Sequence, residues 1–400
     1  MTEIAGETRL LRVQGVTAPE GFRAAGIAAG IKTSGARDLA LVFNEGPDYA
    51  AAGVFTRNRV KAAPVLWTQQ VLTTGQLRAV ILNSGGANAC TGPLGFTDTH
   101  ASAERLAERL AKMLSASAGE IAVCSTGLIG DRLPMDRLLP GVDTAVAAAS
   151  AEGGGAAADA IRTTDTVPKT CRVAGAGYAI GGKAKGAAML APALATMLAV
   201  LTTDADLAAA ELDAALRKAV AVTFDRLDTD GCMSTNDTVL LLASGASGVR
   251  PDLGEFTALL AQGCADLARQ MQLDAEGAGK AIDIEVTGAA SEDDAVTVGR
   301  AVARCNLLKC AIAGEDPNWG RVLAAVGTTA AVFEPDQLNV AINGIWVCRN
   351  GFAAEDRARV DLRPRDVRLT VDLSAGPHAA TIRTTDLTEA YVHENSAYST

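Results

Sequence analysis

Two short apolar runs, at residues 77–82 and 120–124, flank a stretch with the pattern of an amphipathic helix. Both runs end at turns that contain glycine, as buried strands commonly do. Between them, residues 100–114 repeat apolar side chains about every 3.6 positions and carry charges on the other face. Strands and helices in this order bury their apolar faces by packing helices on a sheet. The pattern predicts an α/β fold.

The rest of the chain adds helices and strands without a strict strand–helix alternation. Residues 206–222 and 294–311 have the same helical rhythm. The last third instead alternates apolar with polar side chains, which predicts strands with one face on a core and the other on solvent or a helix layer. These strands are expected at residues 281–286, 338–343, 367–373 and 380–383.

The composition suits a globular protein with a tightly packed core. Of the 400 residues, 48% are hydrophobic and 20% are charged, so the chain is long and apolar enough for one large domain or two smaller ones. Aromatic residues make up only 4%, so small aliphatic side chains must fill the core. Residues 142–160 are nearly all Ala, Gly and Ser with scattered acids, which predicts a surface helix or a flexible connection.

The charge excludes nucleic acid as a partner. The formal net charge is −10 and no run of basic residues appears, whereas phosphate binding needs clustered Lys and Arg. The first residues contain acids and no apolar signal segment, and no apolar run approaches the length of a membrane span, so we expect a cytoplasmic protein. Three isolated histidines and no CxxC pair predict no metal site.

Familiar catalytic motifs fail on inspection. A dinucleotide loop would need a third glycine where Ile180 follows Gly175 and Gly177. No phosphate-binding loop with a GxxxxGK pattern and no GxSxG elbow is present. Since only three histidines could serve as bases, a Ser–His–Asp triad has few candidates. These absences favour a nucleophile that works without histidine.

The run at residues 185–198 is apolar except for Lys185 at its start and Thr196 inside it. One interpretation is a buried helix or strand with a packed threonine, and composition alone favours it. In the other, the Thr196 hydroxyl attacks the carbonyl of Ala195, and an N-to-O shift followed by hydrolysis cuts the chain. The new α-amino group, with an ordinary pKa of roughly 8, then serves as the base for the same hydroxyl.

A series of longer motifs spans the chain in a fixed order. They are residues 53–58 (GVFTRN), 83–89 (NSGGANA), 125–130 (STGLIG), 163–165 (TTD), 185–186 (KG), 195–198 (ATML), 234–238 (STNDT), 316–321 (DPNWGR) and 395–400 (NSAYST). Together they resemble the ornithine acetyltransferases, also called glutamate N-acetyltransferases, of arginine biosynthesis. The resemblance runs from residues 17–22 to the last residue, and it reverses the preference stated above for a packed threonine.

The resemblance implies a cleavage site and a catalytic group. Ala195 and Thr196 match the family's self-cleavage site, and Thr196 matches the nucleophile that carries the acetyl group as an ester. Thr126 and Gly127 match the pair that forms the oxyanion hole. A hydroxyl and an unhindered backbone N–H at a strand end suit that role, each contributing roughly 3–4 kcal/mol when preorganised. Taken alone, residues 125–127 would be an ordinary turn.

The family's substrate contacts match six positions: Thr163, Lys185, Thr196, Glu276, Asn395 and Thr400. A lysine binds a substrate carboxylate and a glutamate binds an ammonium, which suits N-acetylornithine and glutamate. Thr164 remains an alternative to Thr163. Taken alone, Glu276 would be a solvated acid at a helix end and Asn395 a helix cap. The chain departs from the family before the cleavage site, at residues 188, 191 and 193, which bears on the rate of self-cleavage.

The resemblance further implies an overall organisation. It predicts an α/β fold with helix layers packed on β-sheets, similar to N-terminal-nucleophile enzymes, cut into an α chain (1–195) and a β chain (196–400) that assemble as α2β2. The expected reaction is ping-pong acetyl transfer without a metal or cofactor, with acetyl-CoA as a candidate second donor. Two alternatives remain: a self-processing aminopeptidase or amidohydrolase in which water is the acceptor, and a binding protein that has lost processing.

Overall fold

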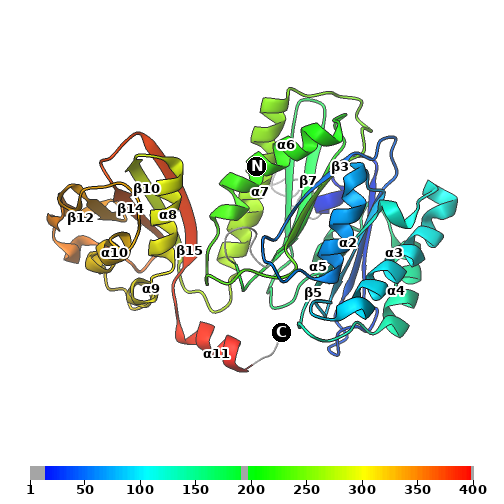
Figure 1. The fold of residues 1–400 in the computed structure, drawn as a ribbon, viewed down its shortest axis with the longest axis horizontal. Coiled ribbons are helices and arrows are strands. Elements are labelled where there is room, and N and C mark those ends of the chain that lie inside the picture. Colours follow the sequence, from blue (N-terminus) through cyan, green and yellow to red (C-terminus); the bar gives the residue numbers. More distant parts are fainter. Residues whose placement is uncertain (1–13, 191–196, 398–400) are drawn as a thin grey trace, which may run out of the picture.

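The computed structural model describes residues 14–190 and 197–397, which form a layered sandwich followed by a smaller unit (Figure 1). Two sheets lie face to face in the sandwich. The first sheet has the order β1 (Phe22–Ile27), β2 (Leu39–Asn44), β4 (Ala79–Ser84) and β5 (Ile121–Thr126). The second has the order β3 (Ala51–Phe55), β9 (Thr238–Ala243), β8 (Leu198–Thr203), β7 (Ala179–Lys185) and β6 (Lys169–Ala174).

Helices cover the outer faces of both sheets and the edges of the first. On the first sheet, α3 (Gly92–Leu114) and α4 (Met135–Ala148) cover the outer face, while α2 (Ala63–Val71) lies along edge strand β5 and α5 (Gly154–Ala160) along edge strand β1. On the second sheet the helices are α6 (Ala209–Val222) and α7 (Leu253–Leu273). Leu198 and Leu240 share a core with the first sheet, whereas Ala199 and Leu241 join the core around α6 and α7. The central strands are therefore buried on both faces, which explains why they are continuous apolar runs.

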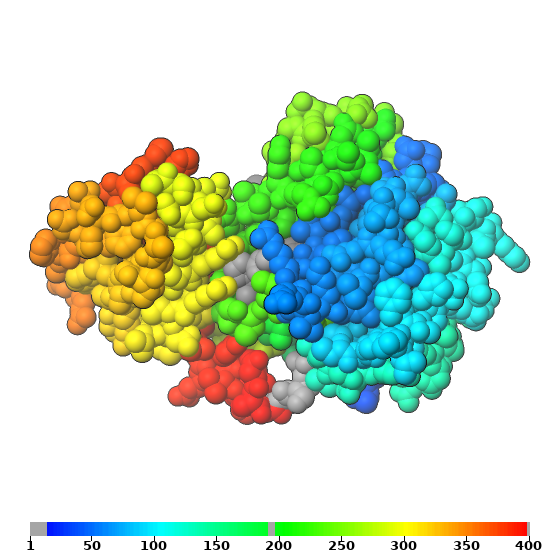
Figure 2. Space-filling model, viewed as in Figure 1, coloured from blue at the N-terminus to red at the C-terminus, as the bar shows by residue number. Residues whose placement is uncertain are grey.

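The smaller unit is one six-stranded sheet with helices against it. Its order is β13 (Phe352–Ala353), β12 (Ile345–Arg349), β11 (Asn339–Ile342), β14 (Asp366–Asp372), β10 (Ala281–Ala289) and β15 (His378–Thr385). Its helices are α8 (Glu292–Ala303), α9 (Asn306–Ala313) and α10 (Trp319–Val326). The last described helix, α11 (Glu389–Ala397), leaves this unit and lies below its junction with the sandwich (Figures 1 and 2).

Short 3-10 helices occur at several connections. They are η1 (Gly15–Thr17), η2 (Leu72–Thr74), η3 (Ala118–Glu120), η4 (Phe224–Arg226), η5 (Pro335–Gln337) and η6 (Arg357–Arg359). None of the helices in the described ranges is both long and apolar enough to cross a membrane. The predicted α/β fold with helix layers on β-sheets is confirmed.

The single helix expected at residues 294–311 is wrong. The helix is interrupted between α8 and α9, where Cys305 has φ −76° and ψ 95° and precedes the first residue of α9. Val302 before the break and Leu308 after it pack into the same core. Since the apolar rhythm continues across the break, the sequence pattern could not reveal it.

The surface helix or flexible connection expected at residues 142–160 is correct only for residues 142–148, which complete the partly exposed helix α4, and is wrong for the rest of the segment. Part of this segment forms α5, whose Ala157 and Ala160 are fully buried. The helix lies so close to β1 that a Cβ at Gly26 would clash with the carbonyl oxygen of Ala156. Small residues are abundant here because the backbones approach closely, not because the segment is flexible.

The second sheet contains strands from both sides of the expected cleavage site. Before the site lie β3, β6 and β7, and after it lie β8 and β9. Strands β7 and β8 pair antiparallel with Lys185 opposite Leu198, and β3 pairs with β9. Ala195 and Thr196 themselves lie outside the described residues. A cut between them would separate the chain without separating the sheet, because these ladders join the two halves.

Candidate active site

A cavity of about 420 Å³ lies where β5 and β7 end, beside the turn at Glu276 and helix α11. Residues from seven separate parts of the chain line it. Among them are Thr126, Gly127, Thr163, Lys185, Glu276 and Asn395, all chosen from the sequence. Thr164 lines it as well, so the geometry leaves the choice between Thr163 and Thr164 open. Thr196 and Thr400 lie outside the described residues.

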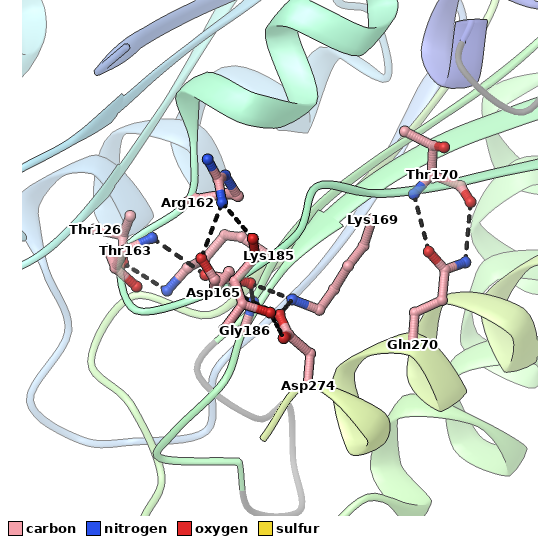
Figure 3. Close-up of polar contacts among 11 residues, drawn as sticks. Thr126, Arg162, Thr163, Asp165, Lys169, Thr170, Lys185, Gly186, Gln270 and Asp274 are labelled. Atoms are coloured by element: carbon pink, nitrogen blue, oxygen red, sulfur yellow. Dashed lines mark hydrogen bonds and ion pairs between the residues drawn. The ribbon is translucent and has the colours of Figure 1, made fainter. Parts of the chain in front are cut away.

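Lys185 is the buried cation of the cavity. It is the last residue of β7, its exposed fraction is 3%, and its Nζ donates to Thr126 Oγ1 at 3.2 Å (Figure 3). Burial lowers its pKa, while the nearby carboxylates of Asp165, Asp237 and Glu276 act in the opposite direction. A buried ammonium at the wall of a cavity is suited to bind a carboxylate, which would replace its lost hydration.

A network of buried charges fixes the residues around Lys185. Asp165 accepts hydrogen bonds from Lys169 Nζ at 2.6 Å and from the N–H of Gly186 at 2.7 Å (Figure 3). Lys169 also pairs with Asp274 at 2.6 Å. Burial would raise the pKa of Asp165, but Lys185, Lys169 and the Gly186 N–H outweigh it and hold the pKa at about 2. The network therefore connects the end of β7 to the turn that carries Glu276.

Gly127 ends β5 in a conformation that requires glycine. Its φ is +135°, and a Cβ at this position would clash with the backbone nitrogen of Gly86. The N–H groups of Gly85 and Gly86 both donate to the carbonyl of Thr126, at 2.9 and 3.0 Å. The side chain of Asn236 donates to the carbonyl of Ser125 at 2.8 Å. The strand end that carries the two expected oxyanion-hole residues is thus held from both sides.

Glu276 and Asn395 meet in the wall of the cavity. Asn395 Nδ2 donates to Glu276 Oε2 at 3.0 Å, and the N–H of Glu276 donates to the carbonyl of Ala187 at 2.9 Å. Gly277, with φ +60°, lets α11 approach, since a Cβ there would clash with the backbone of Tyr391. Both expected substrate contacts therefore face the cavity and each other.

Asp237 belongs to the motif at residues 234–238, and the sequence alone assigns it no role. It is fully buried, its Oδ1 accepts the N–H of Met197 at 3.1 Å, and its Oδ2 has no hydrogen-bond partner among the described residues. Burial raises its pKa well above the usual range, against the opposing influence of the Met197 N–H and of Lys185. Asp237 thus holds the residue directly after Thr196.

Metal ligands do not cluster in the part of the chain that the structure describes: no group of three His, Cys, Asp or Glu side chains is placed to hold an ion. The cavity is lined instead by hydroxyl, amide and charged groups such as Ser234, Thr235 and Asn236. Such a lining suits a small polar substrate held by several hydrogen bonds.

Comparison with known proteins decides the family. The sequence profile of the ArgJ family matches residues 23–400. This chain belongs to the ArgJ family. It is 69% identical over 96% of its length to the arginine biosynthesis bifunctional protein ArgJ of Thermobifida fusca, covering 100% of that protein. It is 62% identical over its whole length to the ArgJ of Mycobacterium tuberculosis (strain H37Rv), again covering 100%. The resemblance found in the sequence is confirmed.

A solved structure gives a further ArgJ comparison. The ornithine acetyltransferase of Mycobacterium tuberculosis complexed with ornithine is 65% identical over 47% of this chain and 97% of that chain, with a TM-score of 0.43.

Proposed function

We propose that this chain is an acetyltransferase of arginine biosynthesis that moves an acetyl group from N-acetylornithine to glutamate. Its relatives at 62–69% identity are called arginine biosynthesis bifunctional proteins. The observation that carries the proposal is the cavity itself, which brings Thr126, Gly127, Lys185 and Glu276 together. Asn236 in its lining directly precedes Asp237, which accepts the N–H of Met197, the residue after Thr196.

Self-cleavage comes first. The Thr196 hydroxyl attacks the carbonyl of Ala195, the acyl group moves from nitrogen to oxygen, and water hydrolyses the resulting ester. The products are an α chain (1–195) with a new carboxylate and a β chain (196–400) whose Thr196 has a free amine. The β7–β8 and β3–β9 ladders support this division because they hold both chains in one sheet.

Acetyl transfer follows on the freed residue. The Thr196 amine accepts the hydroxyl proton while Oγ attacks the acetyl carbonyl of N-acetylornithine. Lys185 donates to Thr126 Oγ1, so the Thr126 proton is free to stabilise the oxyanion together with the Gly127 N–H. The C–N bond then breaks, ornithine leaves with the proton, and the amine of glutamate attacks the acetyl ester of Thr196.

Charge complementarity sets the substrate class. Lys185 binds the carboxylate of each substrate, and Glu276 binds the side-chain ammonium of ornithine with Asn395 beside it. Thr163 and Thr400 complete the proposed contacts. The chemistry uses the chain's own hydroxyl and amine and needs no cofactor, while acetyl-CoA can enter as a second donor. The active form is proposed to be an α2β2 assembly.

Electrophoresis and mass spectrometry test the proposal. The purified protein should give two fragments of 195 and 205 residues under denaturing conditions, the second beginning Thr-Met-Leu-Ala-Val. After mixing with N-acetylornithine alone, an acetyl adduct should appear on Thr196. Thr196→Ala should be uncut and unlabelled, whereas Thr97→Ala, an exposed position on α3, should behave like the native protein.

The outcomes separate the proposal from its alternatives. An intact chain that binds N-acetylornithine without reacting would indicate a binding protein. Release of free acetate, or of amino acids from peptides, in place of transfer to glutamate would indicate a hydrolase. A fragment with a different N-terminus would move the nucleophile and contradict the mechanism.

A further inference from the structure

A second cavity, of about 440 Å³, lies between the sandwich and helix α8 and is lined by arginines. We call it the arginine cavity, after Arg57, Arg226, Arg300 and Arg304 in its wall. Figure 2 shows the yellow segment that contains α8 beside the green part of the sandwich. The proposed acetyl transfer assigns no role to these residues.

Two of these arginines have buried N–H groups without an acceptor. Arg226, with an exposed fraction of 8%, donates from Nε to the carbonyl of Ala221 and pairs through Nη2 with Glu292, but its Nη1 has no partner among the described residues. Arg300 donates from Nη2 to the carbonyl of Asp225, while its buried Nε likewise has none within the described ranges. Unpaired buried donors are costly and indicate a missing acceptor.

The arginine cavity gathers four guanidinium groups on an acidic protein. Its lining carries four arginines and two acids, Asp225 and Asp293, and Arg226 also pairs with Glu292 at 2.6 Å, while the chain as a whole has a net charge of −10. Arg304 is neutralised in part by the buried Asp228, 2.8 Å away. Burial lowers the pKa of Arg300 in spite of the nearby acids, so its charge lacks full compensation. An anion with several acceptor oxygens fits this lining.

The arginine cavity shares a wall with the candidate active site. Met233 lines the arginine cavity, while its chain neighbours Cys232 and Ser234 line the other, and consecutive Cα atoms are only about 3.8 Å apart. Thr56 Oγ1 donates to the carbonyl of Ser234 at 2.7 Å, and Asn58 Nδ2 donates to that of Met233 at 2.9 Å. Thr56 and Asn58, on either side of Arg57, therefore anchor residues 232–234, the segment that separates the two cavities.

We propose that the arginine cavity binds the phosphate groups of a nucleotide thioester that donates acetyl groups to Thr196, a donor of the acetyl-CoA class. Guanidinium groups match phosphate oxygens in geometry and charge, and N-acetylornithine has no phosphate. The donor's phosphates would lie on one side of the 232–234 segment and its thioester on the other. The inference rests on the proposed acetyl transfer and adds the recognition site for the second donor.

The transfer step itself is the same as with N-acetylornithine. Thr196 Oγ attacks the thioester carbonyl, the new C–O bond forms as the C–S bond breaks, and the thiol leaves with the proton that the hydroxyl gave up. Glutamate then takes the acetyl group from Thr196. No oxidant or further reactant is needed.

The test compares two donors in two cavity variants. Arg300→Gln removes a half-buried guanidinium, and Arg57→Gln removes an exposed one. The second variant keeps the test decisive if the first folds poorly. Arg217→Gln, on the exposed face of α6, is the matched control. Steady-state kinetics with acetyl-CoA, acetyl-pantetheine and N-acetylornithine, each with glutamate, give KM for every donor. Calorimetry with coenzyme A and with inorganic phosphate measures binding directly.

We expect each cavity variant to raise the ratio of the acetyl-CoA KM to the N-acetylornithine KM by about tenfold or more, as loss of one charge-assisted contact would. The acetyl-pantetheine KM should not follow this rise, because that donor lacks the nucleotide, and Arg217→Gln should change nothing. An unchanged ratio overturns the inference. The inference is also overturned if the native protein binds inorganic phosphate but the cavity variants leave the acetyl-CoA KM unchanged, because the cavity would then be a site for free anions. Absence of N-acetylornithine transfer in the native protein would instead refute the proposed function.

Discussion

Lys183 is a buried amine whose replacement should stabilise the protein. It lies on β7 two residues before Lys185, so both side chains extend from the same face of the strand. Its exposed fraction is 0%, and its Nζ donates to the carbonyl of Ala157 at 3.2 Å. Burial lowers the pKa of Lys183 from 10.5 to about 7, with a smaller opposing influence from Cys124. The folded protein thus disfavours the charged form.

The sign and size of the effect follow from linkage. Between pH 7 and pH 10.5 the unfolded chain binds the proton more tightly than the folded protein, so stability rises with pH in this window. Each pH unit is worth about 1.4 kcal/mol, so the full cost, present below pH 7, is about 5 kcal/mol. Lys183→Met keeps the length of the side chain and replaces the ionisable amine by an uncharged group. It also loses the hydrogen bond to Ala157, worth about 1 kcal/mol. The variant should therefore be more stable by roughly 4 kcal/mol at pH 6.5.

Urea denaturation followed by circular dichroism measures this difference. Both proteins should carry Thr196→Ala, which is expected to leave one uncut chain and a reversible transition. The advantage of Lys183→Met should shrink by about 3 kcal/mol between pH 6.5 and pH 9.5. Lys218→Met, at an exposed position on α6, should show no such trend. A variant that is less stable at every pH, or an advantage independent of pH, would refute the reasoning.

Three further predictions concern the active site. Gly127→Ala should lower kcat by about a hundredfold or more, since φ +135° and the clash with the Gly86 backbone displace an oxyanion-hole donor; normal turnover would remove Gly127 from that role. Glu276→Gln should lower kcat/KM for N-acetylornithine by a factor that corresponds to about 1.5–3 kcal/mol of lost transition-state stabilisation, and should leave self-cleavage intact. Unchanged kinetics would make Glu276 a solvated acid. Because burial raises the pKa of Asp237 well above its usual range, Asp237→Asn should still accept the Met197 N–H and should remove from the pH–rate profile the change caused by ionisation of Asp237. A pH–rate profile identical to that of the native protein would contradict this.

The strands of the sandwich show where sequence patterns reach their limit. Strands such as β14, with one face on the core and one exposed, alternate clearly and were predicted within a residue or two. Strands β8 and β9 were not predicted, although β4 and β5, which are buried to the same extent, were expected from their apolar runs and glycine-containing turns. A short apolar run of this kind cannot be distinguished from a buried helix by periodicity. Motifs rather than patterns located Thr196 between β7 and β8.

The active site was predictable in part, for a different reason. Thr126, Lys185 and Glu276 lie far apart in the sequence, and only the family resemblance selected them for one site before the fold was known. Asp237 could not be singled out, since its importance comes from its contact with the Met197 N–H. The arginine cavity left no sequence signal at all, because its four arginines are spread from residue 57 to residue 304. The overall negative charge argued only against nucleic acid as a partner.

The strands of the second sheet lie on both sides of the proposed cleavage site along the chain, which leads to a final prediction about the order of events. Strands β3, β6 and β7 precede the site and β8 and β9 follow it, so neither half contains the whole sheet. Lys185 pairs opposite Leu198, so the ladder forms only when both halves are present. Folding must therefore precede cutting, because the site that performs the cleavage needs residues from both sides.

Co-expression of residues 1–195 with a chain that begins at Thr196, exposed by removal of an initiator Met, separates assembly from cleavage. If cutting serves only to release the Thr196 amine, the two halves should assemble through the β7–β8 and β3–β9 ladders and transfer acetyl groups without any cleavage step. The same pair carrying Thr196→Ala should assemble but not react. Halves that assemble with a free Thr196 and still form no acetyl adduct from N-acetylornithine would contradict the ping-pong mechanism, and direct transfer between bound substrates would have to replace it.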